Sequence, residues 1–90
     1  MSFSHPKISK KFRFQWEAAQ NNYVLLYPEG MVKLNNSAGE ILAQCDGLKS
    51  VPEIIHALEK KFETSGLEPQ VIDFLEHATT QSWICEGGNG

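Results

Sequence analysis

The sequence predicts a small α+β domain in which a three-stranded antiparallel sheet precedes three helices, in the order βββααα. In the first third of the chain, apolar and polar residues alternate, which is typical of half-buried strands. From residue 35 onward, apolar residues recur at every third or fourth position, which is typical of amphipathic helices. The chain has 90 residues, 41% apolar and 21% charged, so it has room for one domain with a thin core.

Three segments carry the strand pattern. Residues 12–16 alternate between aromatic and polar side chains, and residues 23–27 form a continuous run of strand-forming residues. The pattern resumes over residues 31–34. Between the last two segments, Pro28 and Gly30 favour a tight turn, because proline fixes φ at its first corner and glycine tolerates a positive φ. We therefore expect a meander of three antiparallel strands.

Three amphipathic stripes follow the strands. Ser37 with Glu40 and Ser50 with Glu53 have the spacing of a capping box, in which each side chain accepts a hydrogen bond from the other residue's backbone N–H. Asn35, Asn36 and Ser37 are all good caps for the first helix, and we expect Gly47 to end it. We expect the pair of Ser50 and Glu53 to begin the second helix. The apolar positions of the three stripes are Ala38, Ile41, Leu42 and Cys45, then Val51, Ile54, Ile55, Leu58 and Phe62, then Val71, Phe74, Leu75 and Ala78.

Positive charge is concentrated at the N-terminus. Residues 1–16 contain three lysines and one arginine but no acidic residue, whereas the rest of the chain has four lysines and eleven carboxylates, for a net charge of −3. Nucleic acid binding requires a basic face, so any contact with DNA would depend on the N-terminal segment alone. We expect residues 1–11 to form a flexible basic arm, residues 12–84 a single folded domain and residues 85–90 a flexible tail.

The sequence offers few residues for catalysis, metal binding or membrane insertion. His5, His56 and His77 are scattered without metal-ligand spacing, and Cys45 lies on an apolar stripe, where a thiol is usually buried and inert. We therefore expect no metal, no cofactor and no enzymatic activity. No run approaches the roughly 20 apolar residues of a membrane span, and neither a secretory signal nor a disulfide framework is visible. These features favour a cytoplasmic protein without membrane contact.

The predicted sheet has an edge that a second chain could complete. A strand at the edge of a sheet leaves N–H and C=O groups unpaired, and an extended peptide can add a strand there. Residues 31–34 carry one charge among three apolar residues, so this edge is weakly guarded. We expect a peptide to lie against this edge and the third helix, although most of the helical positions are better explained as core. The candidate residues are Met31, Val32, Lys33 and Leu34 on the strand and Val71, Phe74, Leu75 and Ala78 on the helix.

One long segment resembles a known family. Residues 23–55 read YVLLYPEGMVKLNNSAGEILAQCDGLKSVPEII, and this run resembles the PqqD family. The resemblance extends over about residues 12–84. Its most specific pieces are Leu26-Tyr27-Pro28-Glu29-Gly30, Lys33-Leu34-Asn35, Glu40-Ile41-Leu42 and Cys45-Asp46-Gly47.

The resemblance implies a non-catalytic chaperone in pyrroloquinoline quinone biosynthesis. Proteins of this family bind the ribosomal precursor peptide PqqA and present it to PqqE, a radical S-adenosylmethionine enzyme. Related domains share a winged-helix-like fold, called the RiPP recognition element, in which the leader peptide pairs with the third strand and lies against the third helix. On this chain, those elements are residues 31–34 and about residues 69–81, within a peptide-binding domain of residues 12–84.

Two alternatives remain open from the sequence. A winged-helix module that binds DNA would have the same elements, but its recognition helix should be basic, whereas the third helix here is net acidic. For this reason we expect no nucleic acid partner. An exposed strand edge could also pair two copies of the chain, so a homodimer is a further expectation.

Overall fold

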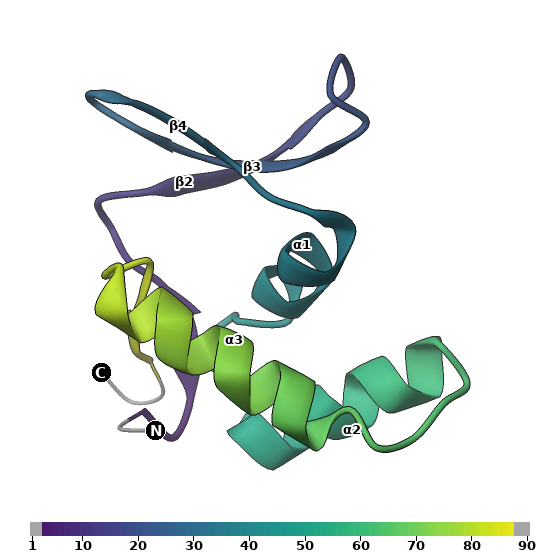
Figure 1. The fold of residues 1–90 in the computed structure, drawn as a ribbon. Coiled ribbons are helices and arrows are strands. Elements are labelled where there is room, and N and C mark those ends of the chain that lie inside the picture. Colours follow the sequence, from purple (N-terminus) through teal and green to yellow (C-terminus); the bar gives the residue numbers. More distant parts are fainter. Residues whose placement is uncertain (1–2, 88–90) are drawn as a thin grey trace.

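The computed structural model describes residues 3–87 of the chain (Figure 1). Its helices and strands confirm the α+β fold, with the meander and the three helices in the expected order and a further strand at each end. Within residues 3–87 the elements are β1 (Pro6–Ile8), β2 (Arg13–Glu17), β3 (Asn22–Tyr27), β4 (Gly30–Lys33), α1 (Asn36–Ala43), α2 (Val51–Lys61), α3 (Glu68–Thr80) and β5 (Ile84–Glu86).

The three-stranded sheet has the order β2-β3-β4, and both of its strand pairs are antiparallel. Leu25 in the central strand lies opposite Phe14 on one side and Val32 on the other, so these three residues share one face. Leu25 is fully buried in the core. On the same face, the rings of Phe14 and Tyr23 stack with centroids 4.5 Å apart. This face of the sheet is therefore directed toward the helices (Figure 1).

The starts of the first two helices are set by side-chain caps. Asn35 caps α1, because its side-chain oxygen accepts a hydrogen bond of 2.8 Å from the N–H of Ala38. Of the three candidate caps, the structure uses Asn35, so the pairing of Ser37 with Glu40 does not form the cap. At α2 the expected capping box is confirmed: Ser50 and Glu53 bond to each other's backbone N–H.

Gly47 does not end α1 as expected, because that helix stops at Ala43 and is capped by Gln44. Gly47 instead lies in the connection to α2 with a φ of +80°, a conformation that glycine adopts without strain. Its N–H donates a hydrogen bond of 3.0 Å to the carbonyl of Pro6. This hydrogen bond links the connection between α1 and α2 to β1.

Two segments near the ends of the chain, β1 and β5, pair with each other, which differs from the flexible arm and tail expected from the sequence. β1 pairs with β5 in a two-stranded antiparallel sheet, and Pro6 is among the fully buried residues. The N–H of Gly87 donates to the carbonyl of His5 at 2.7 Å. β1 and β5 have three residues each, which is too short to show an alternating pattern in the sequence. They also lie at opposite ends of the sequence, so no local signal indicates that they pair. Residues 1–2 and 88–90 of the expected arm and tail lie outside the described residues.

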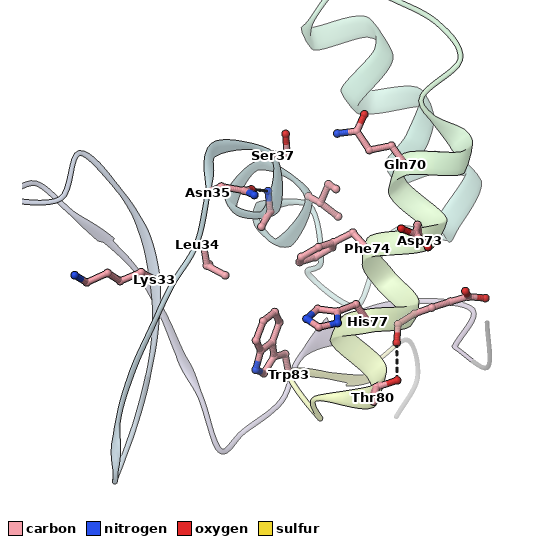
Figure 2. Close-up of a pocket in the computed structure, with 13 residues that line it drawn as sticks. Lys33, Leu34, Asn35, Ser37, Gln70, Asp73, Phe74, His77, Thr80 and Trp83 are labelled. Carbon is pink, nitrogen blue, oxygen red and sulfur yellow. Dashed lines mark hydrogen bonds between the residues drawn. The ribbon is translucent and has the colours of Figure 1, made fainter.

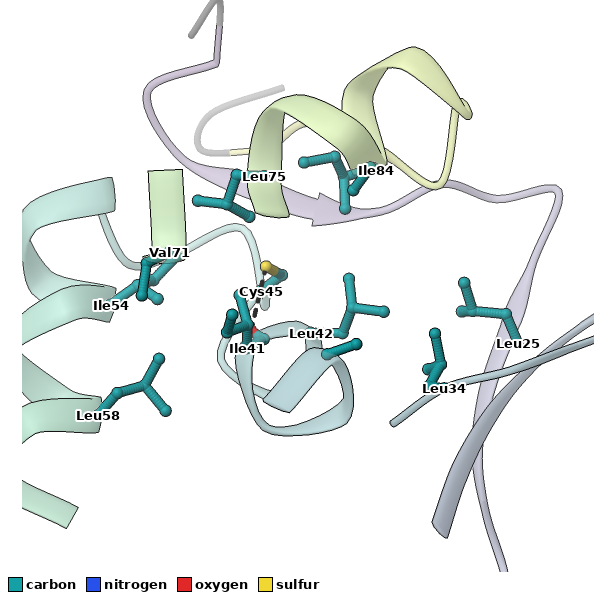
Figure 3. Close-up of a cluster of buried hydrophobic side chains, with 12 residues drawn as sticks. Leu25, Leu34, Ile41, Leu42, Cys45, Ile54, Leu58, Val71, Leu75 and Ile84 are labelled. Carbon is teal, nitrogen blue, oxygen red and sulfur yellow. Dashed lines mark hydrogen bonds between the residues drawn. The ribbon is translucent and has the colours of Figure 1, made fainter. Parts of the chain in front are cut away.

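The core joins the sheet, the three helices and β5, with α1 in the middle (Figure 3). Ile41 and Leu42 of α1 lie between the sheet residues on one side and the residues of α2 and α3 on the other. Cys45 is buried here, and burial raises the pKa of its thiol to about 12, so it stays protonated. The buried members of this cluster are Leu25, Leu34, Ala38, Ile41, Leu42, Cys45, Ile54, Leu58, Val71, Leu75, Ala78 and Ile84.

No helix within residues 3–87 combines the length and the apolar character that crossing a membrane requires.

Replacement of Gly39 by alanine is expected to destabilise the protein, although alanine favours helices. A Cβ at this position would lie 2.8 Å from Cδ2 of Tyr23, whose ring is held by Phe14 and Trp16. The overlap should outweigh the gain in helix propensity of about 1 kcal/mol and leave a net loss of about 1–3 kcal/mol. Thermal unfolding measures the change. Ser37→Ala, on the exposed side of the same helix, is the control and should not lower the melting temperature.

The joined termini are expected to loosen in acid. The pKa of Glu86 is lowered, first by the backbone N–H of Ser4 at 2.8 Å, then by the Ser4 hydroxyl and the N–H of His5. Because the pKa is lower in the folded protein, the carboxylate stabilises the fold at neutral pH. This contribution is lost as the pH falls through the lowered pKa.

Denaturant unfolding across pH tests this expectation. At neutral pH, Glu86→Gln should unfold at lower denaturant concentration than the wild type, and the gap should close as the pH falls. The exposed Glu29 provides the control, and Glu29→Gln should follow the wild type at every pH. A gap for Glu86→Gln that stays constant in acid would contradict the proposed role of the carboxylate.

Candidate functional site

A groove of about 680 Å³ separates the end of β4 and the start of α1 from the outer face of α3 (Figure 2). Leu34 points into it from the strand side, and Phe74, His77 and Trp83 point toward Leu34 from the opposite wall. The groove exists because α1 separates the sheet from α3 and no side chain of the described residues fills the remaining gap. Its lining residues are Lys33, Leu34, Asn35, Ser37, Ala38, Ile41, Gln70, Asp73, Phe74, Glu76, His77, Thr80 and Trp83.

The wall formed by α3 is aromatic in the middle and polar at its rim. The ring of Trp83 meets His77 edge-on, with centroids 5.3 Å apart, and lies 6.3 Å from the ring of Phe74. Around these rings, Asp73 and Glu76 are exposed to solvent. The wall can therefore bury apolar side chains at its centre and meet polar groups at its edge.

The structure separates the four helical residues predicted for the site. Phe74 lines the groove, whereas Val71, Leu75 and Ala78 are buried in the core, each with an exposed fraction of 1% or less. The core alternative considered for this stripe therefore holds for three of its four members. A segment docked in the groove cannot reach these three.

Sequence reasoning found Phe74 but missed the other residues of α3 that line the groove, which are Gln70, Asp73, Glu76, His77 and Thr80. These positions recur at helical spacing, one step around the helix from the apolar stripe. Their mixed polarity hides them from a search for apolar periodicity. A search for a helical face with isolated aromatic residues would have found them.

The strand wall of the groove ends in an edge with unpaired main-chain groups. Within residues 3–87, β4 pairs with β3 on one side and with no strand on the other. The N–H of Leu34 donates to the carbonyl of Tyr23 at 3.3 Å, so Leu34 and Tyr23 form a hydrogen-bonded pair. Along two antiparallel strands, residue pairs alternate between hydrogen-bonded and non-hydrogen-bonded. In this register Val32 faces β3, opposite Leu25. The N–H and C=O groups of Met31 and Lys33 therefore point outward.

The four strand residues predicted for the site thus have different positions. Met31 and Lys33 present main-chain groups at the edge and are exposed, and Lys33 also lines the groove. The side chain of Lys33 points away from α3 (Figure 2). Leu34 supplies apolar surface to the groove, and Val32 belongs to the face directed toward the helices.

The arrangement can bind an extended segment, but main-chain pairing alone would bind it weakly. Met31 and Lys33 offer four outward groups, each contributing about 0.5–1.5 kcal/mol net if paired. Ordering a flexible segment costs about 2–5 kcal/mol or more, so these terms nearly cancel. Burial of apolar side chains against Leu34, Phe74 and Trp83, at about 25 cal/mol per Å², must supply the rest.

Four titratable side chains line the groove, namely Lys33, Asp73, Glu76 and His77. No nucleophilic cysteine lies among them, since Cys45 is in the core. Within residues 3–87, no group of three or more histidine, cysteine, aspartate or glutamate side chains is placed to hold a metal ion.

Comparisons with known proteins agree on one family. The family model described as coenzyme PQQ synthesis protein D (PqqD) matches residues 22–84. A PqqA binding protein of Azotobacter vinelandii is 56% identical over 80 residues, which cover 88% of this chain and 87% of the relative. A PqqA binding protein of Methylococcus capsulatus is 48% identical over 80 residues, covering 89% and 86%.

A solved structure shares the fold. It is the solution structure of the PqqD part of Methylobacterium extorquens PqqCD, described as a functional and stand-alone RiPP recognition element. The TM-score is 0.75, and the match covers 94% of this chain and 96% of the other, with 22% sequence identity. At this identity the match supports the fold.

Two proline variants test which residues of β4 form the open edge. Val32→Pro removes an N–H that pairs with β3 and should cost about 1–3 kcal/mol of folding free energy, because one bond of the β3–β4 ladder is lost. Met31→Pro removes an outward N–H and should leave the protein folded, because proline is tolerated on strand edges. Thermal unfolding compares the two. Equal destabilisation of the two variants, or a larger loss for Met31→Pro, would contradict the assignment of the outward main-chain groups to Met31 and Lys33.

Proposed function

Because the chain belongs to the PqqD family, we propose that it binds the precursor peptide PqqA in the groove and presents it to the radical S-adenosylmethionine enzyme PqqE. The relatives at 56% and 48% identity are PqqA binding proteins, which supports the first part of this proposal. In this role the protein is a carrier in pyrroloquinoline quinone biosynthesis and performs no chemistry itself.

The observation that carries the proposal is the open edge of β4 beside the groove. A peptide added as a fourth strand would pair with the main chain of Met31 and Lys33. Its side chains alternate between the two faces of the sheet. Those on the side of Leu34 would enter the groove and meet Phe74 and Trp83, while the others would lie beside Lys33. Such a peptide should therefore carry apolar residues at alternate positions.

The mode of binding suits a carrier that must release its peptide. The main-chain bonds leave little net free energy after the peptide is ordered, so affinity depends on a few apolar contacts. Asp73 and Glu76 at the rim of the groove are exposed. A partner enzyme can then reach the parts of the peptide that extend beyond it.

The charge on α3 argues against recognition of DNA. A helix that enters the major groove meets two phosphate backbones and needs basic residues. α3 instead exposes Glu68, Asp73 and Glu76. These carboxylates would repel the phosphates.

Replacement of Phe74 tests the docking site. Phe74→Ala removes the central ring of the groove wall and is expected to weaken PqqA binding by about tenfold, since an aromatic anchor contributes more than 1 kcal/mol. Leu48→Ala is the matched control, because Leu48 is 76% exposed and lies in the connection between α1 and α2, outside the groove. Its affinity should stay within about twofold of the wild type.

Calorimetric titration with synthetic PqqA gives the affinities, and backbone amide shifts locate the binding site. In the wild type, shifts should concentrate at β4 and the groove side of α3. Circular dichroism confirms that each variant is folded before titration. Shifts confined to the N-terminal segment, or equal affinities for Phe74→Ala and the wild type, would exclude the groove.

A further inference from the structure

Three basic side chains surround a second hollow, which lies at the start of β2. Its volume is about 440 Å³, and it is lined by Lys10, Lys11 and Arg13 with Phe12, Leu26, Tyr27 and Pro28. No carboxylate lies among these lining residues, and none of them lines the peptide groove. We refer to this site as the basic hollow.

The backbone around the basic hollow is held in place from several sides. The N–H of Ser9 donates to the carbonyl of Trp83 at 2.8 Å, and the N–H of Phe12 donates to Ser9 at 3.0 Å. The ring of Phe12 meets that of Tyr27 edge-on, with centroids 5.6 Å apart. Although we expected a flexible arm here, the structure presents these charges on an ordered framework.

The charges of the basic hollow are not neutralised within the described part of the chain. Among residues 3–87, Lys49 pairs with Asp46 at 3.0 Å and Lys61 with Glu40 at 2.6 Å, but no ion pair involves Lys10, Lys11 or Arg13. Three like charges around one hollow repel one another. An incoming carboxylate would relieve this repulsion.

We propose that the basic hollow docks an acidic surface segment of the protein that takes over the bound peptide. This inference rests on the proposed carrier function. The hollow lies on β2 and the end of β3, whereas the open edge belongs to β4, so one protein can hold the peptide and the partner at the same time. Arginine and aromatic side chains are the residues that most often anchor protein interfaces.

The charge of the remaining surface favours a protein partner over nucleic acid. The hollow accommodates a few side chains, and beyond residue 16 the chain carries eleven carboxylates against four lysines. A long polyanion would meet this acidic body, whereas a short acidic segment would not. The same contrast in charge would steer and orient the partner before contact.

Charge neutralisation tests the basic hollow. The variant Lys10→Gln/Lys11→Gln/Arg13→Gln is compared with Lys49→Gln/Lys60→Gln/Lys61→Gln, which removes the same number of positive charges elsewhere. The affinity for PqqE is measured with and without PqqA, at low and at high salt. We expect the first variant to lose about tenfold or more at low salt and to bind PqqE with a weaker salt dependence, while the control stays within about twofold.

The affinity for PqqA is measured on the same samples and should be unchanged in both variants, which also shows that they are folded. Equal losses for the two variants, or no loss for either, would overturn the basic hollow as the docking site. Competition between a short DNA duplex and PqqE for the wild type would also overturn it. If PqqA fails to bind the wild type, the carrier function is wrong. If the Lys10/Lys11/Arg13 variant binds both PqqA and PqqE as the wild type does, only the docking role of the basic hollow is rejected.

Discussion

The close packing of α1 between the sheet and the other helices determines the geometry on which binding depends. Gly39 brings the helix so near to β3 that any side chain would overlap Tyr23. On its other side, Ile41 and Leu42 pack toward α2 and α3 (Figure 3). α1 therefore acts as a spacer that keeps β4 apart from α3. An unpaired edge and a partly aromatic helix face are thereby held apart at a fixed separation, which creates the groove.

The joined termini add a second framework to this arrangement. β1 and β5 close the chain on itself, and the connection after α3 then serves two surfaces. The carbonyl of Trp83 accepts a hydrogen bond from Ser9, which leads into the basic hollow, while its ring forms part of the groove wall. The peptide groove and the basic hollow are therefore both held in place by the connection that contains Trp83.

Local patterns in the sequence predict most of the fold because they reflect local forces. The meander, the three helices and the capping box at Ser50 follow from periodicity and side-chain caps. The pairing of β1 with β5 does not, because it joins short segments from opposite ends of the chain and has no local signature. The start of α1 is predicted only to within three residues, because Asn35, Asn36 and Ser37 are all good caps, and the structure uses Asn35.

The candidate site is predicted only in part. The sequence predicts the strand edge, because the last strand of a meander has only one neighbour. It does not predict which N–H and C=O groups of β4 point outward. That depends on the hydrogen-bonding register, which the bond from Leu34 to Tyr23 reveals. On α3, apolar periodicity identifies the core-facing side, so three of its four predicted residues lie away from the groove. A binding face must remain soluble when it is empty, and its mixed composition therefore gives a weak signal in the sequence.

Hydrogen exchange of individual amides in β4 tests the central claim most directly. On addition of saturating PqqA, the amides of Met31 and Lys33 should exchange more slowly, because they gain partners at the edge. Those of Val32 and Leu34, already bonded to β3, should change little. Slower exchange in β2 instead of β4, or uniform slowing without this alternation, would contradict the account of a peptide that completes the open edge of the sheet.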